Sequence, residues 1–218
     1  MFLTQMHLNP ARRGTRHLLS SPQRVHAAVM LAFPPGTDAD LTNGRILWRV
    51  ETNRNTCTLY VSSPSEPDLT HVIEQAGWPA ASTSGWRTVS TDGFLARLAY
   101  GQEWVFRLTA NPVHSRRNPD GGRGKRYGHV TVAQQEEWLR HRSADWGFNV
   151  LSGSVTSRRM LSFSRCSGGD SRPVTLSVAT FDGLLRVLDS DQFRSSLNAG
   201  VGKAKGYGCG LITLAPSR

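Results

Sequence analysis

Long hydrophobic runs and cysteine motifs are the features that this sequence most clearly lacks. No apolar run approaches the roughly 20 residues that span a bilayer, and the N-terminus MFLTQMHLNPARR lacks the basic-then-apolar order of a secretory signal. The three cysteines, Cys57, Cys166 and Cys209, form no CxxC pair, so neither a disulfide framework nor a cysteine zinc site is indicated. We therefore expect a chain that folds in water, in the cytoplasm and not within a membrane.

Metal-binding and nucleotide-binding patterns are missing as well. The histidines show no HxH, HxxxH or HExxH spacing, and acidic pairs suited to two-metal catalysis are absent. The sequence holds no GxxxxGK[ST] loop, so nucleoside triphosphate binding is disfavoured. We predict no metal and no cofactor, and any nuclease activity should be metal-independent.

Acidic residues are scarce relative to basic ones. The chain has 26 Lys and Arg against 16 Asp and Glu, a formal charge of +10. Such a charge on a folded domain favours a polyanionic partner, and Arg, which clearly outnumbers Lys, matches phosphate in a two-pronged way. Nucleic acid is therefore the leading partner, while an anionic membrane surface and an acidic protein stay possible.

The pattern of apolar residues and turn signals predicts two similar halves. Residues 2–8 read as a strand, residues 21–33 as a helix capped by Ser21, and further strand-like runs and a short helix follow. These lie at residues 45–51, 56–62, 67–76 (the helix) and 86–90. The order β-α-β-β-α-β is that of a ferredoxin-like unit.

The second half shows the pattern of a repeat, because its first strand, 103–110, exits through Asn111-Pro112 as residues 2–8 exit through Asn9-Pro10. A helix capped by Thr131, another begun by Asp189 and a last strand at 211–215 are expected. Strand-like runs at 148–155, 160–164, 174–181 and 184–188 come with a hairpin turn at Asp182-Gly183. The sequence thus predicts an α+β chain of two tandem ferredoxin-like (RRM-like) domains, residues 1–90 and 91–218.

Three features are candidates for function. The segment GVGKAKGYGCG, residues 200–210, has five glycines in eleven residues and two lysines, a composition that lets the backbone approach phosphates. His26 follows a basic loop, where an imidazole can exchange protons near neutral pH. A plain surface loop and a packed or surface histidine are the alternatives. Basic clusters, each usually a solvated face, occur at Arg12, Arg13 and Arg16; Arg116 and Arg117; Arg123, Lys125 and Arg126; and Arg158, Arg159 and Arg165, the last three bracketing a predicted hairpin.

Several of these segments together resemble a known family. LNPARR, SPQRVH, ILWRVE, WVFRLTANPV and GVGKAKGYGCGLITL occur in the order and spacing typical of the CasE family, also called Cse3, the type I-E CRISPR-associated endoribonucleases of the RAMP superfamily. The resemblance runs from residue 1 to residue 216. It implies tandem ferredoxin-like domains that bind the CRISPR repeat stem-loop and cut precursor CRISPR RNA at the 3′ base of the stem, leaving 2′,3′-cyclic phosphate and 5′-OH ends.

The resemblance also implies partners and site residues. Such proteins retain the crRNA, join the other Cascade subunits, need no metal and are monomers when free. His26 matches the catalytic histidine, whereas Gln23 replaces a tyrosine that assists the chemistry in some relatives, so no second catalytic residue is assigned. The residues predicted to contact RNA are Arg12, Arg13, Gln23, Arg158, Arg159, Arg165, Gly200, Gly202, Lys203, Lys205, Gly206 and Gly208.

Two other hypotheses remain open from the sequence. The first is a non-catalytic RNA-binding subunit on the same fold, in which His26 has no chemical role. The second is a basic scaffold whose partner is an acidic protein surface. Cleavage of a repeat RNA distinguishes the enzyme from both.

Overall fold

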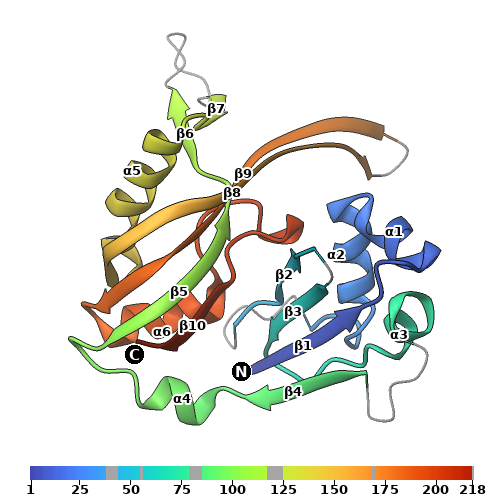
Figure 1. Ribbon diagram of the computed structural model, residues 1–218, viewed down its shortest axis with the longest axis horizontal. Helices are drawn as coiled ribbons and strands as arrows, with labels where there is room; N and C mark the ends of the chain where they lie inside the picture. The colour runs from blue at the N-terminus through green and yellow to red at the C-terminus, as the bar shows by residue number, and fades with distance from the viewer. Residues whose placement is uncertain (38–43, 55, 79–84, 117–124, 168–169, 218) are drawn as a thin grey trace.

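The first half of the chain folds into a four-stranded antiparallel sheet with the strand order β2-β3-β1-β4, as the computed structural model shows (Figure 1). The structure describes residues 1–217 apart from 38–43, 55, 79–84, 117–124 and 168–169. The elements of this half are β1 (Phe2–Leu8), α1 (Arg13–Leu19), α2 (Pro22–Met30), β2 (Leu47–Thr52), β3 (Cys57–Ser63), α3 (Thr70–Ala76) and β4 (Trp86–Ser90).

The second half forms another four-stranded antiparallel sheet, with the order β10-β5-β9-β8, and a separate two-stranded hairpin of β6 and β7. Its elements are α4 (Asp92–Ala96), β5 (Glu103–Ala110), β6 (Val113–Arg116), β7 (Lys125–Gly128), α5 (Val132–Ser143), the 3₁₀ turn η2 (Ala144–Trp146), β8 (Phe148–Ser167), β9 (Asp170–Val187), α6 (Ser190–Ala199), the 3₁₀ turn η3 (Lys205–Tyr207) and β10 (Ile212–Pro216). The two sheets confirm the predicted α+β class with tandem ferredoxin-like halves.

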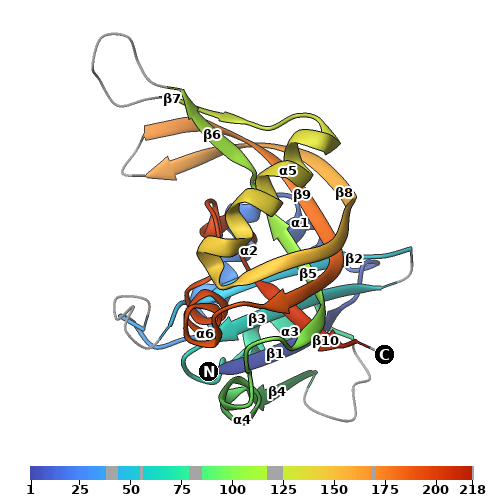
Figure 2. The same cartoon turned by 90° about the vertical axis from the view of Figure 1, so that its left-hand side faces the viewer.

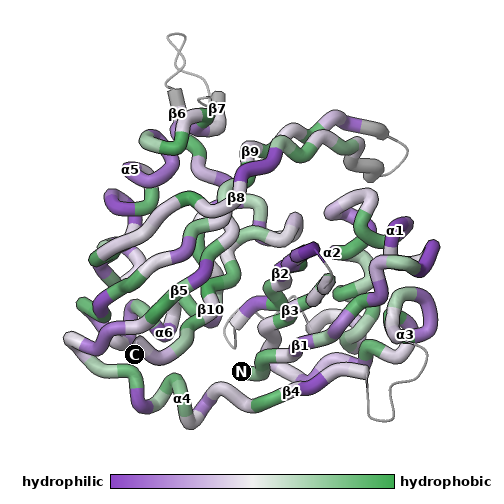
Figure 3. The backbone as a smooth tube through the Cα atoms, viewed as in Figure 1, coloured by the Kyte–Doolittle hydropathy of each residue, from purple (hydrophilic) through white to green (hydrophobic). Residues whose placement is uncertain are grey.

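Each sheet buries its own hydrophobic core against helices. In the first half, Val25 and Val29 of α2 pack with Met6 and Leu59 of the central strands. The second core is richer in aromatic rings. For example, the ring centroids of Phe148 and of Phe193 in α6 lie 5.3 Å apart. Hydrophobic and hydrophilic residues are interspersed along strands such as β5 (Figure 3), as expected for a sheet with only one covered face.

Three predicted helix starts are confirmed by their capping contacts. Ser21 Oγ accepts the N–H of Gln23 at 3.3 Å and so begins α2. Thr131 and Gln134 form a reciprocal capping box at α5. The Asp189 carboxylate accepts the N–H groups of Asp191 and Gln192 at the start of α6. Each cap satisfies donors that the first helical turn leaves open.

The predicted turn at Asp182-Gly183 is wrong. Both residues lie inside β9, where Gly183 pairs with Phe106 of β5 and with Gly153 of β8. A Cβ at Gly183 would lie 2.1 Å from the carbonyl oxygen of Ser152, beside a β-bulge, so this glycine permits a close approach of strands and no reversal. The four predicted runs are therefore two long strands, β8 and β9, and Arg158, Arg159 and Arg165 all lie on β8.

Two basic segments contain regular structure that was not among the predicted elements. Residues 13–19 form helix α1, which is held by α3: the buried Thr15 hydroxyl donates to the carbonyl of Ala76 at 3.1 Å. The segment around residues 113–128 contains the β6–β7 hairpin. Helix α4, in the polar segment between the halves, was also not predicted. Among helices in the described ranges, none combines the length and hydrophobicity of a membrane span.

The arm is the feature of the second half that most affects the site. Strand β5 pairs with β9 only from residue 179 onward, so residues 159–167 and 170–178 pair solely with each other. We call these two segments the arm. Figure 1 shows that the arm extends from the second sheet across to α2 of the first half, whereas Figure 2 shows it from the side, curving away from the sheet that carries it.

Candidate functional site

His26 lies on α2, on the side of the helix that meets the second half of the chain. The neighbouring Val25 and Val29 are buried in the first core, whereas His26 itself is half-buried. A Cβ at Gly206 would lie 3.7 Å from both Nε2 and Cε1 of His26, so the imidazole rests against the backbone of η3. The helix of one half thus presents its histidine to the glycine-rich loop of the other.

The glycine-rich loop, residues 200–210, has a backbone that only glycine permits at several positions. Gly200, Gly202, Gly208 and Gly210 all have φ between +70° and +91°. A Cβ at Gly200 would lie 2.7 Å from a methyl group of Leu47, on β2 of the first half. The loop therefore packs tightly on the first half as well as following its own strained path.

Gly208 is one position in this loop where substitution should be costly. A Cβ there would lie 2.7 Å from the Trp48 ring, and φ is +81°. Gly208→Ala should lower the free energy of unfolding by at least about 1–3 kcal/mol, because the strained backbone alone costs about that much and overpacking against Trp48 adds to it.

Gly93→Ala provides the matched control. Gly93 lies in α4 with nothing within 4 Å of its would-be Cβ, and its φ is not in the left-handed region. This change should leave stability unchanged or raise it slightly, since alanine favours helix. Urea unfolding of both variants tests the prediction, and equal midpoints for Gly208→Ala and wild type would contradict it.

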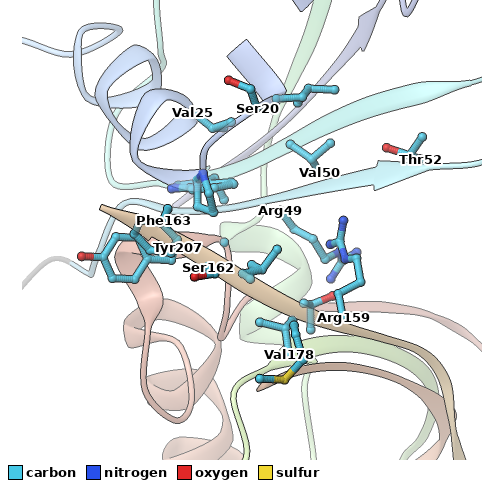
Figure 4. A pocket seen from close by; sticks show the side chains of 17 residues that line it. Ser20, Val25, Arg49, Val50, Thr52, Arg159, Ser162, Phe163, Val178 and Tyr207 are labelled. Carbon is cyan, nitrogen blue, oxygen red and sulfur yellow. The ribbon is translucent and has the colours of Figure 1, made fainter. Parts of the chain in front are cut away.

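A cavity of about 250 Å³ lies between the two halves beside this loop (Figure 4). The first half contributes Ser20, Val25 and Arg49 to its lining, and the second contributes Arg159 and Tyr207. The arm closes one side, because the Phe163 ring meets the Tyr207 ring edge-on with centroids 4.8 Å apart. The cavity is thus walled by α2 and β2, the arm and the glycine-rich loop.

Positive charge gathers around the loop. Lys203 is exposed and Lys205 is half-buried. Burial, and then the charges of Arg45 and Lys203, lower the pKa of Lys205. A bound phosphate would relieve this repulsion between cations, so the loop has both the backbone and the charge of an anion site.

The arginines predicted to contact RNA divide into two groups in the structure. Arg159 lines the cavity, and the exposed Arg158 precedes it at the root of the arm, where its guanidinium donates to the carbonyl of Val130. Arg165 lies near the tip of β8, and its side chain is outside the described part of the molecule. The second group, Arg12 and Arg13, lies at the start of α1.

Arg12 has a structural role that the sequence did not reveal. Its Nη1 donates to the carbonyl oxygens of Ile73 at 3.3 Å and Gly77 at 3.0 Å, at the end of α3. Arg13 is exposed and Gln23 is half-buried on the first turn of α2. None of these three residues lines the cavity, so they stay predictions as RNA contacts, as do His26 and the other predicted residues as functional groups.

Three cavity residues were missed by sequence reasoning. Tyr207 and Phe163 meet only because the arm folds back toward the loop, a contact that no local pattern indicates. Arg49 is a charged residue within the apolar strand pattern ILWRVE, and that interruption was the available signal. In the structure its side chain is buried and lines the cavity.

Comparison with known proteins gives consistent relationships over the whole chain. The model of a family described as "CRISPR associated protein" matches residues 1–216. The CRISPR-associated endoribonuclease Cse3 of Thermus thermophilus is 30% identical, over 99% of this chain and 100% of its own length. The CRISPR system Cascade subunit CasE of Escherichia coli is 28% identical, over 78% of this chain and 88% of its own length.

A solved structure agrees with these sequences. Thermus thermophilus Cse3 bound to an RNA representing a pre-cleavage complex superposes with a TM-score of 0.77 and 28% identity, covering 99% of this chain and 98% of that one. The family match, the 30% identity along nearly the whole chain and the shared fold lead to one conclusion. This chain belongs to the CasE/Cse3 family of CRISPR-associated proteins.

Proposed function

We propose that this protein is an endoribonuclease that binds the hairpin of a CRISPR repeat and cleaves precursor CRISPR RNA at the 3′ base of the stem. The observation that supports it most is the placement of His26 against the glycine-rich loop, between the two halves and beside a cluster of cations. A proton-transfer group therefore lies next to an anion site. The relatives named above act as an endoribonuclease and as a Cascade subunit.

The chemistry proposed for this site is attack by the RNA's own 2′-hydroxyl. The 2′-oxygen forms a bond to the adjacent phosphorus while the bond from phosphorus to the 5′-oxygen breaks, which leaves a 2′,3′-cyclic phosphate and a 5′-hydroxyl. His26 either takes the proton from the 2′-hydroxyl or gives one to the departing 5′-oxygen, and water makes the other transfer. Both roles require only that the imidazole reach the scissile linkage.

Alignment of the reacting atoms is the second requirement. The 2′-oxygen, phosphorus and 5′-oxygen must lie in line, a geometry that a flexible strand rarely adopts. Rigid binding of the stem and of the junction nucleotide therefore promotes the reaction. We propose that phosphate contacts hold the RNA in this way. They come from Lys203 and Lys205 of the loop, from Arg159 of the arm and from Arg158 directly before it. His26 lies in the first half of the chain, whereas these four basic residues lie in the second.

The proposal includes the fate of the product and the setting of the reaction. After cleavage the protein keeps the crRNA and joins the other Cascade subunits, as the name of its Escherichia coli relative suggests. We place it in the cytoplasm, in keeping with the free thiols of Cys57 and Cys209. The domain boundary is proposed at residues 90 and 91, where β4 ends at Ser90 before α4 begins at Asp92.

A gel assay of an end-labelled repeat RNA in EDTA tests the function. We expect a single cut at the 3′ base of the stem and continued retention of the stem-bearing fragment by the protein. RNA that is retarded but intact would support the non-catalytic RNA-binding subunit. Failure to bind RNA, with co-purification of an acidic protein after nuclease treatment, would support the basic scaffold.

A further inference from the structure

A buried arginine joins the two sheets behind the cavity. Arg49 of β2 is 2% exposed and, within the described ranges, is the one charged residue that is buried. Its Nη1 donates to the carbonyl of Leu211 at 3.0 Å and to that of Arg107 at 3.2 Å, and its Nη2 donates to Thr213 Oγ1 at 2.7 Å. These acceptors belong to β5, β10 and the residue preceding β10, so the guanidinium is anchored in the second half.

The contacts continue beyond Arg49 as an unbroken series. Glu51 accepts from Arg49 Nη2 at 2.6 Å and from Arg107 Nη1 at 2.9 Å. Arg107 in turn donates two hydrogen bonds to the carboxylate of Asp182, from Nε at 2.6 Å and from Nη2 at 2.9 Å. Asp182 also accepts from the hydroxyl of Thr156 at 2.6 Å. We call these five residues, Arg49, Glu51, Arg107, Asp182 and Thr156, the interdomain chain.

The two ends of the interdomain chain lie at the two parts of the proposed site. Arg49 lies on β2, which shares a core with α2, the helix of His26. Thr156 lies on β8 within the β-bulge between Val155 and Ser157, directly before the root of the arm. The interdomain chain therefore links the half that carries the imidazole to the strand that carries Arg158 and Arg159.

We propose that the interdomain chain positions the arm relative to His26, and so sets the alignment of RNA held by the second half with the imidazole of the first. This inference rests on the proposed function. A buried ion pair contributes little net stability once desolvation is counted. The two-pronged Arg107–Asp182 contact is of the type that adds geometric specificity. These residues act through position and touch no reacting atom.

Thr156 is the place to break the interdomain chain, because it is exposed and removing its hydroxyl leaves no buried charge without a partner. Thr156→Val deletes the bond to Asp182 while keeping the shape of the side chain. We expect it to lower the single-turnover cleavage rate at saturating RNA about tenfold, since a misplacement near 1 Å can cost about 10²-fold. The Kd for RNA should stay within about twofold, because phosphate contacts, which supply most of the affinity, are untouched.

Two further variants separate positioning from a general loss of structure. Thr156→Ser keeps the hydroxyl and should restore the wild-type rate. Glu51→Gln, in the middle of the interdomain chain, should lower the rate at least as much as Thr156→Val, again with little change in Kd. Glu103→Gln is the matched control, because Glu103 pairs with Arg186 at 2.6 Å between the same strands, β5 and β9, but at an exposed site. It should cleave like wild type.

The outcomes distinguish this inference from the proposed function. Rates are compared in EDTA at a temperature at which circular dichroism shows every variant folded. If wild type cleaves and Thr156→Val cleaves equally fast, or if Thr156→Ser is as slow as Thr156→Val, the inference is overturned and the proposed function stands. If wild type leaves the repeat RNA intact, both are overturned.

Discussion

His26→Ala should lower the rate of repeat RNA cleavage by about 10²–10⁴-fold, the usual contribution of a general acid or base. The Kd for RNA should hardly change, because the phosphate contacts proposed for the loop and the arm are left in place. Single-turnover rates with labelled repeat RNA, measured beside a binding titration of uncleavable RNA, provide both numbers. A loss of rate with retained affinity is the expected result.

The surface histidine His141 supplies the control for this variant. It is exposed on α5, where it pairs with Glu137 at 2.7 Å and lies away from the cavity lining. His141→Ala should cleave at the wild-type rate. Unaltered cleavage by His26→Ala would remove His26 from the chemistry, and an equal loss of rate and affinity would give it a binding role instead.

Charge reversal at the proposed phosphate contacts should have the second largest effect. Arg158→Glu and Lys203→Glu should each weaken RNA binding by roughly tenfold or more at moderate salt. Each should also reduce the slope of log K against log salt by about one, because fewer counterions are released when fewer phosphates are neutralised. Filter binding or fluorescence anisotropy across a salt series measures both quantities.

Arg142→Glu is the corresponding control. Arg142 is an exposed arginine on α5 that pairs with Asp145 at 3.0 Å, and it does not line the cavity. The same change of net charge there should shift affinity only slightly and leave the salt slope near that of wild type. A slope for Arg158→Glu or Lys203→Glu equal to that of wild type would count against the contact concerned.

Local sequence patterns correctly predicted those elements whose structure depends mainly on interactions between residues close in sequence. Strands β1 and β5 begin and end where the sequence indicated. Helix α6 was predicted from Asp189, a cap that works through bonds to the next residues. In these segments propensity and tertiary packing favour the same structure, so the sequence alone sufficed.

The wrong or missing predictions concern segments whose structure depends on contacts with residues far away in the sequence. Helix α1 is short and basic, and it depends on contacts with the end of α3, including the bond from Thr15 to Ala76. Asp182-Gly183 has the composition of a turn, but Gly183 is required by its neighbour across the sheet at Ser152. In both cases the determining partner lies far away in sequence, beyond the reach of any local pattern.

The candidate site shows the same division. His26 and the glycine-rich loop stood out from composition and spacing, and the structure brings them into contact. Arg49, Phe163 and Tyr207 did not, because each gains its place from the meeting of the two halves or from the path of the arm. The sequence could therefore indicate the chemical group and the anion loop but not the walls of the cavity beside them.

The central claim is that the RNA's own 2′-hydroxyl attacks the scissile phosphate with help from His26 and without metal. The most direct measurement compares two repeat hairpins in EDTA, identical except for a single 2′-deoxy sugar at the scissile nucleotide. We predict that the all-ribose RNA is cut to a 2′,3′-cyclic phosphate end, whereas the deoxy RNA binds equally well and stays intact. Cleavage of the deoxy RNA would contradict the account.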